Sequence, residues 1–241
     1  MGGIVSICGL LGLFFVKETK HIQSVKMSLL ESVLYGFKKE VIRKNKMFYI
    51  TLGAMCLFNI AVQVFMPYLL IYLEKTLAFD TVTYSIVMAV VIILASISSV
   101  MFGRITDQIG KRKVCYVAIG LFVSGLLLAS MMKTPVLFIV AGTVMMSGFV
   151  AISVVFMSTI RDYTPLEHVG MFQGIRLLAY VLIPMIVGPY IGDFIIQTFS
   201  KGTYVNGYHE VVNLPVPMIF VVSALIAIFL IIPSRILFPK K

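Results

Sequence analysis

The stretch MFYITLGAMCLFNIAVQVFMPYLLIYL, residues 47–73, runs for its whole length without an Asp, Glu, Lys or Arg. An α-helix needs about 20 predominantly apolar residues to cross a hydrocarbon core of about 30 Å. Five further stretches have the same apolar character: 82–102, 114–132, 136–160, 175–198 and 215–237. Lipid offers the backbone no hydrogen-bond partner, so such segments must be helices. The sequence therefore predicts an all-α, polytopic membrane protein with six spans.

The composition agrees with this prediction. Of the 241 residues, 60% are hydrophobic and 12% are charged, and the mean hydropathy is +1.03. All but three of the 20 Lys and Arg residues fall on one side of the predicted spans, the exceptions being Lys75, Lys133 and Lys201. Basic residues gather on the cytoplasmic side of membrane proteins. We therefore expect a multi-pass protein of the cell membrane with a cytoplasmic C-terminus and no role in binding nucleic acid.

The chain divides into three parts. The apolar run within residues 1–16 would reach only about 20 Å as a helix, so it predicts a partial transmembrane helix. Residues 17–46 predict a cytoplasmic linker, in which apolar side chains of 24–46 recur every three or four residues. That pattern favours an amphipathic helix along the membrane interface, and the alternative is a solvated basic linker. Residues 47–241 form the six-helix domain.

Two predicted cytoplasmic loops carry the most specific motifs. In residues 103–113, Gly103 and Gly110 would let the backbone turn tightly between two helices. Asp107 is placed to accept hydrogen bonds from a helix N-terminus, and the three basic residues after Gly110 would anchor the next helix at lipid headgroups. Residues 161–174 form the second loop, which contains Asp162, Pro165, Gly170 and Gly174.

These loops resemble those of the major facilitator superfamily. The first matches the family pattern G-x-x-x-D-x-x-G followed by basic residues, except that Gln108 stands where an Arg is usual. The second matches D-x-x-P-x-x-x-x-G-x-x-x-G, with Val169 at a position that is commonly basic. The resemblance covers nearly the whole chain. It implies the end of helix six, the central linker and helices seven to twelve, which is the C-terminal half of a twelve-helix fold.

The resemblance implies a secondary transporter whose two halves rock to give alternating access to a small polar solute. It also implies a gating role for residues at the cytoplasmic loops: Gly103, Asp107, Gly110, Lys111, Arg112, Lys113, Arg161, Asp162, Gly170 and Arg176. Arg176 could instead extend to the membrane surface, or pair with Asp107 or Asp162. The implied partners are the solute, together with H⁺ or Na⁺ if the carrier is a symporter, the lipid bilayer, and the missing N-terminal half or a second chain.

Polar groups at membrane depth are candidates for the solute pathway. Asn59 and Gln63 lie four residues apart on one helix face, and Pro67 follows one turn later with Tyr68 directly after it. Such amides could contact solute, or they could join helices by hydrogen bonds. Ser147 is a further candidate, although it lies among small residues that are typical of close helix packing. Pro184, with Gly188, Pro189 and Gly192, predicts a broken helix that could flex.

Other functions remain as alternatives. The predicted spans hold no acidic residue at mid-depth, so coupling to an ion would need a carboxylate from the missing half, or the protein is a facilitator. The spacing of Cys8, Cys56 and Cys115 indicates neither a metal site nor a disulfide, and no cofactor is expected. A membrane-embedded enzyme would need clustered catalytic partners that the spacing does not offer. The remaining alternative is a non-transporting scaffold, or a truncated fragment that needs a partner half.

Overall fold

The computed structural model describes residues 37–165 and 169–239. Six of its helical stretches are long and apolar enough to cross a membrane. They are Lys46–Thr76, Thr81–Arg104, Lys111–Met131, Pro135–Tyr163, Phe172–Phe199 and Met218–Leu237. The predicted six-helix, all-α membrane fold is therefore confirmed. The predicted partial helix in residues 1–16 lies outside the described residues, as does most of the predicted linker 17–46.

The elements follow one another in an order set by the six spans. They are α3 (Lys39–Lys44), α4 (Lys46–Ile71), α5 (Thr81–Ile109), α6 (Lys111–Met131), α7 (Pro135–Tyr163), α8 (Val169–Leu177), α9 (Ile183–Phe199), β1 (Thr203–Val205), β2 (Val211–Asn213), α10 (Met218–Ile228) and α11 (Ile231–Leu237). Two π-helical turns, η1 (Tyr72–Thr76) and η3 (Leu178–Leu182), extend α4 and join α8 to α9.

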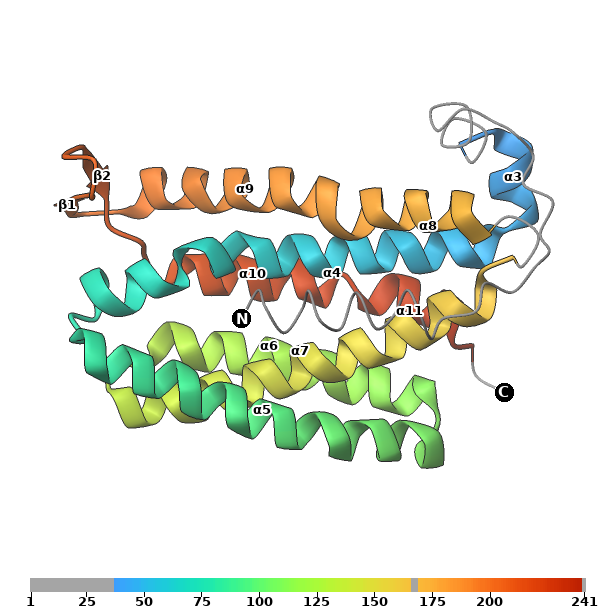
Figure 1. Ribbon diagram of the computed structural model, residues 1–241, viewed down its shortest axis with the longest axis horizontal. Helices are drawn as coiled ribbons and strands as arrows, with labels where there is room; N and C mark the ends of the chain where they lie inside the picture. The colour runs from blue at the N-terminus through green and yellow to red at the C-terminus, as the bar shows by residue number, and fades with distance from the viewer. Residues whose placement is uncertain (1–36, 166–168, 240–241) are drawn as a thin grey trace, which may run out of the picture.

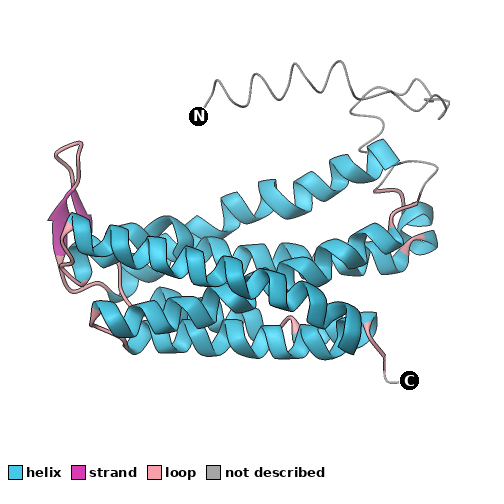
Figure 2. Ribbon diagram, turned by 60° about the horizontal axis from the view of Figure 1, so that its bottom comes forward, coloured by secondary structure: helices cyan, strands magenta, loops and turns pink. Residues whose placement is uncertain are grey.

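The long helices lie side by side along the long axis of the molecule (Figures 1 and 2). The strands β1 and β2 form an antiparallel hairpin at one end, which we call the hairpin end. The opposite end, where α3 lies, we call the basic end. In the bundle, α5 packs mainly on α7 and α9 mainly on α4, while α6 and α10 contact each other and cover α7 and α4. Consequently α5 and α9 lie at opposite edges of the bundle in Figure 1.

Aromatic side chains fill the space between these layers. Phe58 of α4 lies edge-on to Phe122 of α6, with ring centres 5.4 Å apart, and it also contacts Phe149 of α7. Nearer the hairpin end, Tyr72 and Phe138 both contact the ring of Phe220 in α10. Such pairs contribute about 0.5–1.5 kcal/mol beyond the apolar area that they bury. They fix α4 against α6, α7 and α10, and α4 is therefore the central helix of the bundle.

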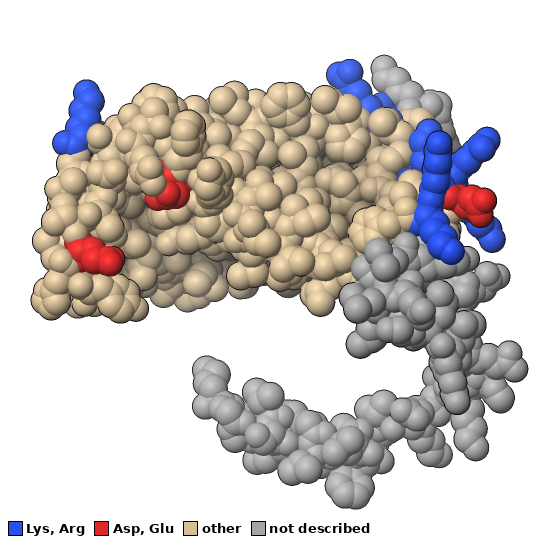
Figure 3. Space-filling view, turned by 90° about the horizontal axis from the view of Figure 1, so that it is seen from above, with Lys and Arg blue, Asp and Glu red and all other residues tan. Residues whose placement is uncertain are grey.

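The charged side chains gather at the two ends and leave an apolar band between them. In the view of Figure 3, most of the Lys and Arg side chains lie at the basic end. Within the described residues, the basic side chains at the hairpin end are Lys75, Lys133 and Lys201. This separation by position is what a bilayer requires, since charges are costly in hydrocarbon and favourable at the headgroups.

Two predicted loops are shorter or more ordered than expected. The predicted loop 103–113 is almost entirely helical, because α5 continues to Ile109 and α6 begins at Lys111. Gly103 lies inside α5 and makes no turn, and the change of direction falls on Gly110 alone, with φ of +90°. The second predicted loop, 161–174, is also shortened by α7 and α8. Residues 200–214, between the fifth and sixth spans, contain the β1–β2 hairpin.

Candidate functional site

The predicted pathway amides lie on a half-exposed stripe of α4. Asn59 and Gln63 are both partly buried, and Met66 and Leu70 continue the same stripe as exposed side chains. The Asn59 amide Nδ2 donates to the Met55 carbonyl oxygen of its own helix at 2.8 Å. Among the described residues, the Gln63 side chain makes no hydrogen bond to another helix. Neither amide therefore joins α4 to another described helix by a hydrogen bond. Contact of these amides with solute stays a prediction.

Glycines let α9 approach α4 very closely beside these amides. A Cβ atom placed on Gly188 would lie 2.3 Å from the Cβ atom of Gln63, and one on Gly192 would lie 2.4 Å from the Val64 carbonyl oxygen. Both distances are far below any ordinary contact, so only glycine fits at these two positions. The Tyr68 hydroxyl adds a hydrogen bond, donating to the Pro189 carbonyl oxygen at 2.9 Å. The two helices are thus fixed to each other at Gln63 and at Tyr68.

Prolines and π turns modify both helices of this pair. Pro67 lies inside α4, which ends in the π turn η1. Pro184 is buried at the start of α9, directly after the π turn η3. The predicted break at Pro184 is wrong, because the helical span is continuous from Phe172 to Phe199. The π turn shifts the backbone hydrogen bonds just before the proline, so the missing N–H is accommodated without a break. Such π turns occur frequently at functional sites.

The small residues of α7 pack against neighbouring helices. Ser147 is 8% exposed, and its hydroxyl donates to the Ser98 hydroxyl of α5 at 2.9 Å. A Cβ atom on Gly148 would lie 2.3 Å from the backbone nitrogen of Phe122, and α6 approaches α7 as closely at Gly125. The interpretation of these small residues as a packing surface is confirmed. A contact between Ser147 and solute would need this hydroxyl to change partner, and it stays a prediction.

The predicted gating residues meet at the basic end of the bundle. Lys111, at the start of α6, forms an ion pair with Asp162, at the end of α7. Arg176 contacts Gln173 and the Met157 sulfur instead, at 3.3 and 3.4 Å. Pairing of Arg176 with Asp162 is therefore wrong, because Lys111 holds that carboxylate. The side chain of Asp107 and the surroundings of Gly170 lie outside what the structure describes, so their predicted roles stay predictions.

A cavity opens beside these residues at the basic end. It has a volume of about 540 Å³ and lies between α7 and α8. Its polar lining comes from Arg161, Ser158 and Thr164 on one side and from Gln173 and Arg176 on the other. Lys113 is exposed near the start of α6, and Arg112 lines a separate, smaller hollow with Arg235. The predicted gating residues whose side chains the structure describes thus share one end of the bundle and do not converge on a single point.

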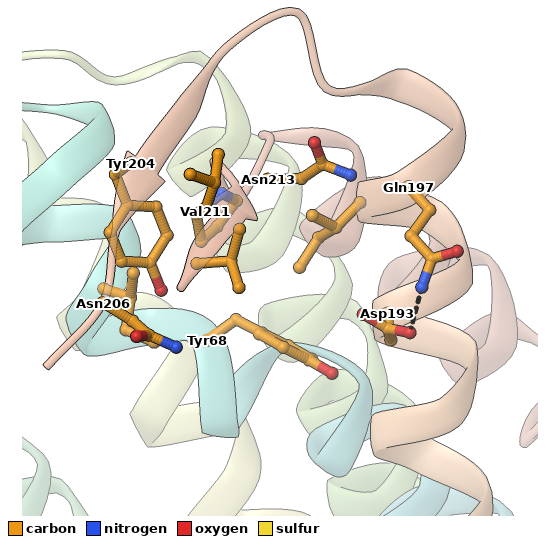
Figure 4. A pocket seen from close by; sticks show the side chains of 11 residues that line it. Tyr68, Asp193, Gln197, Tyr204, Asn206, Val211 and Asn213 are labelled. Carbon is orange, nitrogen blue, oxygen red and sulfur yellow. Dashed lines mark hydrogen bonds between the residues drawn. The ribbon is translucent and has the colours of Figure 1, made fainter. Parts of the chain in front are cut away.

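A second cavity lies under the β-hairpin and was not predicted from the sequence. It has a volume of about 550 Å³, and we call it the hairpin cavity. Figure 4 shows the Tyr68 ring between two walls, with Asp193 and Gln197 of α9 on one side and Tyr204 and Asn206 on the other. The remaining lining residues are Ile71, Ile196, Val211, Val212, Asn213 and Pro215. Of the predicted pathway residues, only Tyr68 lines it.

The hairpin cavity could have been detected in part from the sequence. Asn206-Gly207 is flanked by the β-branched runs 203–205 and 211–213, which is a usual signal for a hairpin. The position of Asp193 near the hairpin end of its helix was evident as well. What the sequence could not provide is the placement of both over Tyr68, since this depends on how α4 and α9 cross.

Metal ligands do not cluster in the part of the chain that the structure describes: no group of three or more His, Cys, Asp or Glu side chains could hold an ion. Of the two described cysteines, Cys56 is partly buried and Cys115 is buried, where its sulfur lies 3.4 Å from the Ser234 hydroxyl. The polar groups of this bundle are therefore amides, hydroxyls and phenols within the spans, with charges at the two ends.

The membrane-spanning part of the chain matches a known protein family. Residues 51–241 match the sequence model of a family described as the Major Facilitator Superfamily. The match begins within α4 and continues to the C-terminus, so it includes all six membrane-length helices. No curated protein matches the chain.

Proposed function

This chain belongs to the major facilitator superfamily, and on that premise we propose that it moves a small polar solute across the membrane by alternating access. The family consists of transporters, and the matched region supplies six helices, half of the twelve-helix fold. In such carriers the solute path lies between two six-helix halves, and one half rocks against the other. We propose that the other half is an N-terminal domain or a second chain.

The observation that carries this proposal is the half-exposed face of α4 and α7. Helices α6 and α10 cover one side of this pair, whereas no described helix covers the other side, between α5 and α9. On that open side α4 presents Asn59 and Gln63, and α7 presents half-buried side chains that include Thr143 and Ser153. The Thr143 hydroxyl is buried and has no hydrogen-bond partner among the described residues. Because this hydroxyl is closed off in the present arrangement, the polar side chains that a solute could reach on this face are the partly buried Asn59, Gln63 and Ser153.

The side chains on this face favour a neutral solute. Each amide offers two N–H donors and one acceptor oxygen, which suits a compound with hydroxyl or amide groups better than an ion. Within the described spans, the carboxylates Glu74 and Asp193 lie near the hairpin end and none lies at mid-depth. If H⁺ or Na⁺ is carried with the solute, as in a symporter, its binding carboxylate belongs to the other half. Otherwise the carrier is a facilitator.

We propose that the basic end faces the cytoplasm, in the cell membrane, and that the C-terminus lies on the same side. The separation of the basic residues supports this orientation, since cytoplasmic segments carry an excess of Lys and Arg. We further propose that the ion pair of Lys111 and Asp162 holds α6 and α7 together on that side. Asp107 would bias the equilibrium between the two access states without touching solute, because its helix position is far from mid-depth.

The second candidate function is a non-transporting scaffold, which the same open face would also permit. An enzymatic role is not proposed, because the partly buried amides and hydroxyls of the described spans have no paired base. An uptake assay distinguishes a transporter from a scaffold, because only a transporter moves solute into liposomes. The purified chain is reconstituted in liposomes, either alone or together with a co-expressed N-terminal half taken from a member of the family. Uptake of radiolabelled neutral polyols and amides is then recorded.

Substitutions on α4 test the proposed path. Asn59→Leu and Gln63→Leu should each raise the half-saturation constant about ten- to hundredfold, because each removes a hydrogen bond to solute worth about 1–3 kcal/mol. Ser96→Leu is the matched control, since Ser96 is exposed and its hydroxyl bonds only to the Ile92 carbonyl oxygen of its own helix. Unchanged constants in both α4 variants would assign the path elsewhere. No uptake with either preparation would favour the scaffold.

A further inference from the structure

The hairpin cavity carries a net negative charge at its wall. Asp193 is the one ionised side chain among its lining residues, which include no Lys and no Arg. Its Oδ2 atom accepts a hydrogen bond from the Gln197 amide at 2.6 Å, and within the described residues its Oδ1 atom has no partner. Lys75, on the extension of α4, is held by its neighbour Glu74 at 2.8 Å. The Asp193 charge therefore has no ion-pair partner in the part of the chain that the structure describes.

The polar side chains of the cavity come from α4, α9 and the hairpin segment. In Figure 4, Asp193 and Gln197 of α9 lie at the far side of the Tyr68 ring from Tyr204 and Asn206. Because the Gln197 amide nitrogen is used by Asp193, its oxygen remains available as an acceptor. The Asn206 side chain is fully engaged in the hairpin turn, where it accepts from the backbone of Tyr208 and Glu210 and donates to the Glu210 carboxylate. Its role is to hold the hairpin over the cavity.

Two phenol rings complete the lining, and one of them is fixed. The Tyr68 hydroxyl donates to the Pro189 carbonyl oxygen at 2.9 Å, so the far end of this side chain is held against α9. Tyr204 faces it from β1. Phenol faces attract cations because the ring face carries partial negative charge. A carboxylate oxygen, an amide oxygen and two ring faces around one cavity are therefore all complementary to positive charge.

From this arrangement we propose that the hairpin cavity is a binding site for a small organic cation that carries an ammonium group and hydroxyl groups. The ammonium group binds the free Asp193 Oδ1 and the Gln197 oxygen beside the Tyr68 ring, and the hydroxyl groups meet Asn213 and Tyr204. An anion would be repelled by Asp193. The proposal concerns binding at this site alone and is independent of whether the chain transports the solute proposed above.

Glucosamine and glucose are suitable probes, because they differ at one position, where an ammonium group replaces a hydroxyl. Equilibrium dialysis of each radiolabelled probe, at about pH 6 so that the amine is charged, is carried out with the full chain in lipid nanodiscs. We expect glucosamine to bind at least tenfold more tightly than glucose. Equal affinities would show a site for neutral polyols, and this outcome would overturn the proposal.

Substitutions then assign the charge that is responsible. Asp193→Asn keeps the shape of the side chain and should weaken glucosamine binding about ten- to hundredfold, with glucose unaffected. Asp80→Asn is the matched control, since it removes one negative charge at the same end of the bundle and outside the cavity lining. It should leave both affinities unchanged.

A variant with gained affinity excludes misfolding as the cause. Asn213→Asp places a second carboxylate at the rim on an exposed strand residue, and it should tighten glucosamine binding severalfold. If Asp193→Asn binds glucosamine like the wild type, or if Asn213→Asp weakens binding, the proposed site is wrong. A loss of affinity in Asp80→Asn as large as that in Asp193→Asn would also overturn it, because the effect would then come from general surface charge.

Discussion

The close crossing of α4 and α9 gives the sharpest structural prediction. Gly188→Ala adds one methyl group that would lie 2.3 Å from the Gln63 Cβ atom and 2.8 Å from the Gln63 carbonyl carbon. Ordinary van der Waals contacts begin near 3.4 Å, so the helices must separate locally by about 1 Å. Two backbones cannot be relieved by a change of rotamer. Such overpacking costs about 1–3 kcal/mol.

The same change from glycine to alanine should have the opposite effect on stability where the helix surface is open. Gly120 is exposed in α6, and a Cβ atom there would meet nothing within 4 Å. Replacing a helical glycine by alanine in open space stabilises the helix by about 0.5–1 kcal/mol. When the purified protein is unfolded in mixed detergent, the free energy of unfolding of Gly188→Ala should therefore be lower than that of the wild type. That of Gly120→Ala should be equal to the wild-type value or higher.

A double substitution tests whether Gln63 is the group that is struck. Gln63→Gly removes the Cβ atom at the shortest distance, so the combination with Gly188→Ala should be less destabilised than the sum of the two single changes. Coupling between touching residues is usually about 0.5–3 kcal/mol. If Gly188→Ala is as stable as Gly120→Ala, or if the two changes simply add, the reasoning from this crossing is refuted.

Three further predictions concern the ends of the bundle. Lys111→Asp and Asp162→Lys should each lower the free energy of unfolding by about 1 kcal/mol or less, because both side chains are partly exposed and such pairs are weak. The double exchange should recover most of the loss. Failure to recover it in low salt would argue against the ion pair. In a variant without native cysteines, Lys111→Cys should resist an impermeant maleimide outside intact cells while Lys201→Cys reacts, and the reverse result would invert the proposed orientation. Hydrogen bonds from the Thr83 hydroxyl and N–H hold the pKa of Asp80 below its ordinary value, so this carboxylate stabilises the start of α5 above its unfolded pKa of about 3.9 and loses that effect as the pH falls through its lower folded value. The difference in melting temperature between wild type and Asp80→Asn should accordingly be present at neutral pH and shrink in strong acid, and a difference that does not change with pH would contradict the role of the charge.

The number and order of the spans could be predicted because apolar length alone determines them. The helix ends could not be predicted as well, and 103–113 shows why. The sequence predicts a turn at Gly103, yet a glycine inside a helix costs only about 1 kcal/mol and the polar residues after it can remain helical beyond the membrane. Only Gly110, with φ of +90°, has a conformation that requires glycine, and no local signal distinguishes it from Gly103.

The candidate sites divide in the same way. Asn59 and Gln63 could be identified from the sequence, because an amide at mid-depth in an apolar helix is unusual wherever its neighbours lie. The sequence permits an ion pair between Arg176 and Asp162, whereas in the structure Asp162 pairs with Lys111. The choice between two basic residues depends on the relative positions of α6, α7 and α8, which no spacing within one segment contains. The bond from Tyr68 to Pro189 joins residues 121 positions apart and is equally absent from any local pattern.

The α4–α9 pair links the two proposed binding regions physically. At mid-depth it presents Gln63 to the open face, directly beside Gly188. One to two turns nearer the hairpin end it carries Tyr68, whose hydroxyl is bonded to α9 and whose ring lines the hairpin cavity. Any movement of α9 relative to α4 must therefore change the surroundings of Gln63 and either break or carry along the bond from Tyr68. A cation held between Tyr68 and Asp193 would contact both helices and would favour the arrangement in which they are closed, since a ligand shifts an equilibrium by its difference in affinity for the two states. The short glycine contacts make this crossing sensitive to a single methyl group. Because the helices touch so closely, binding of a cation at the hairpin end would also change the surroundings of Gln63 at mid-depth.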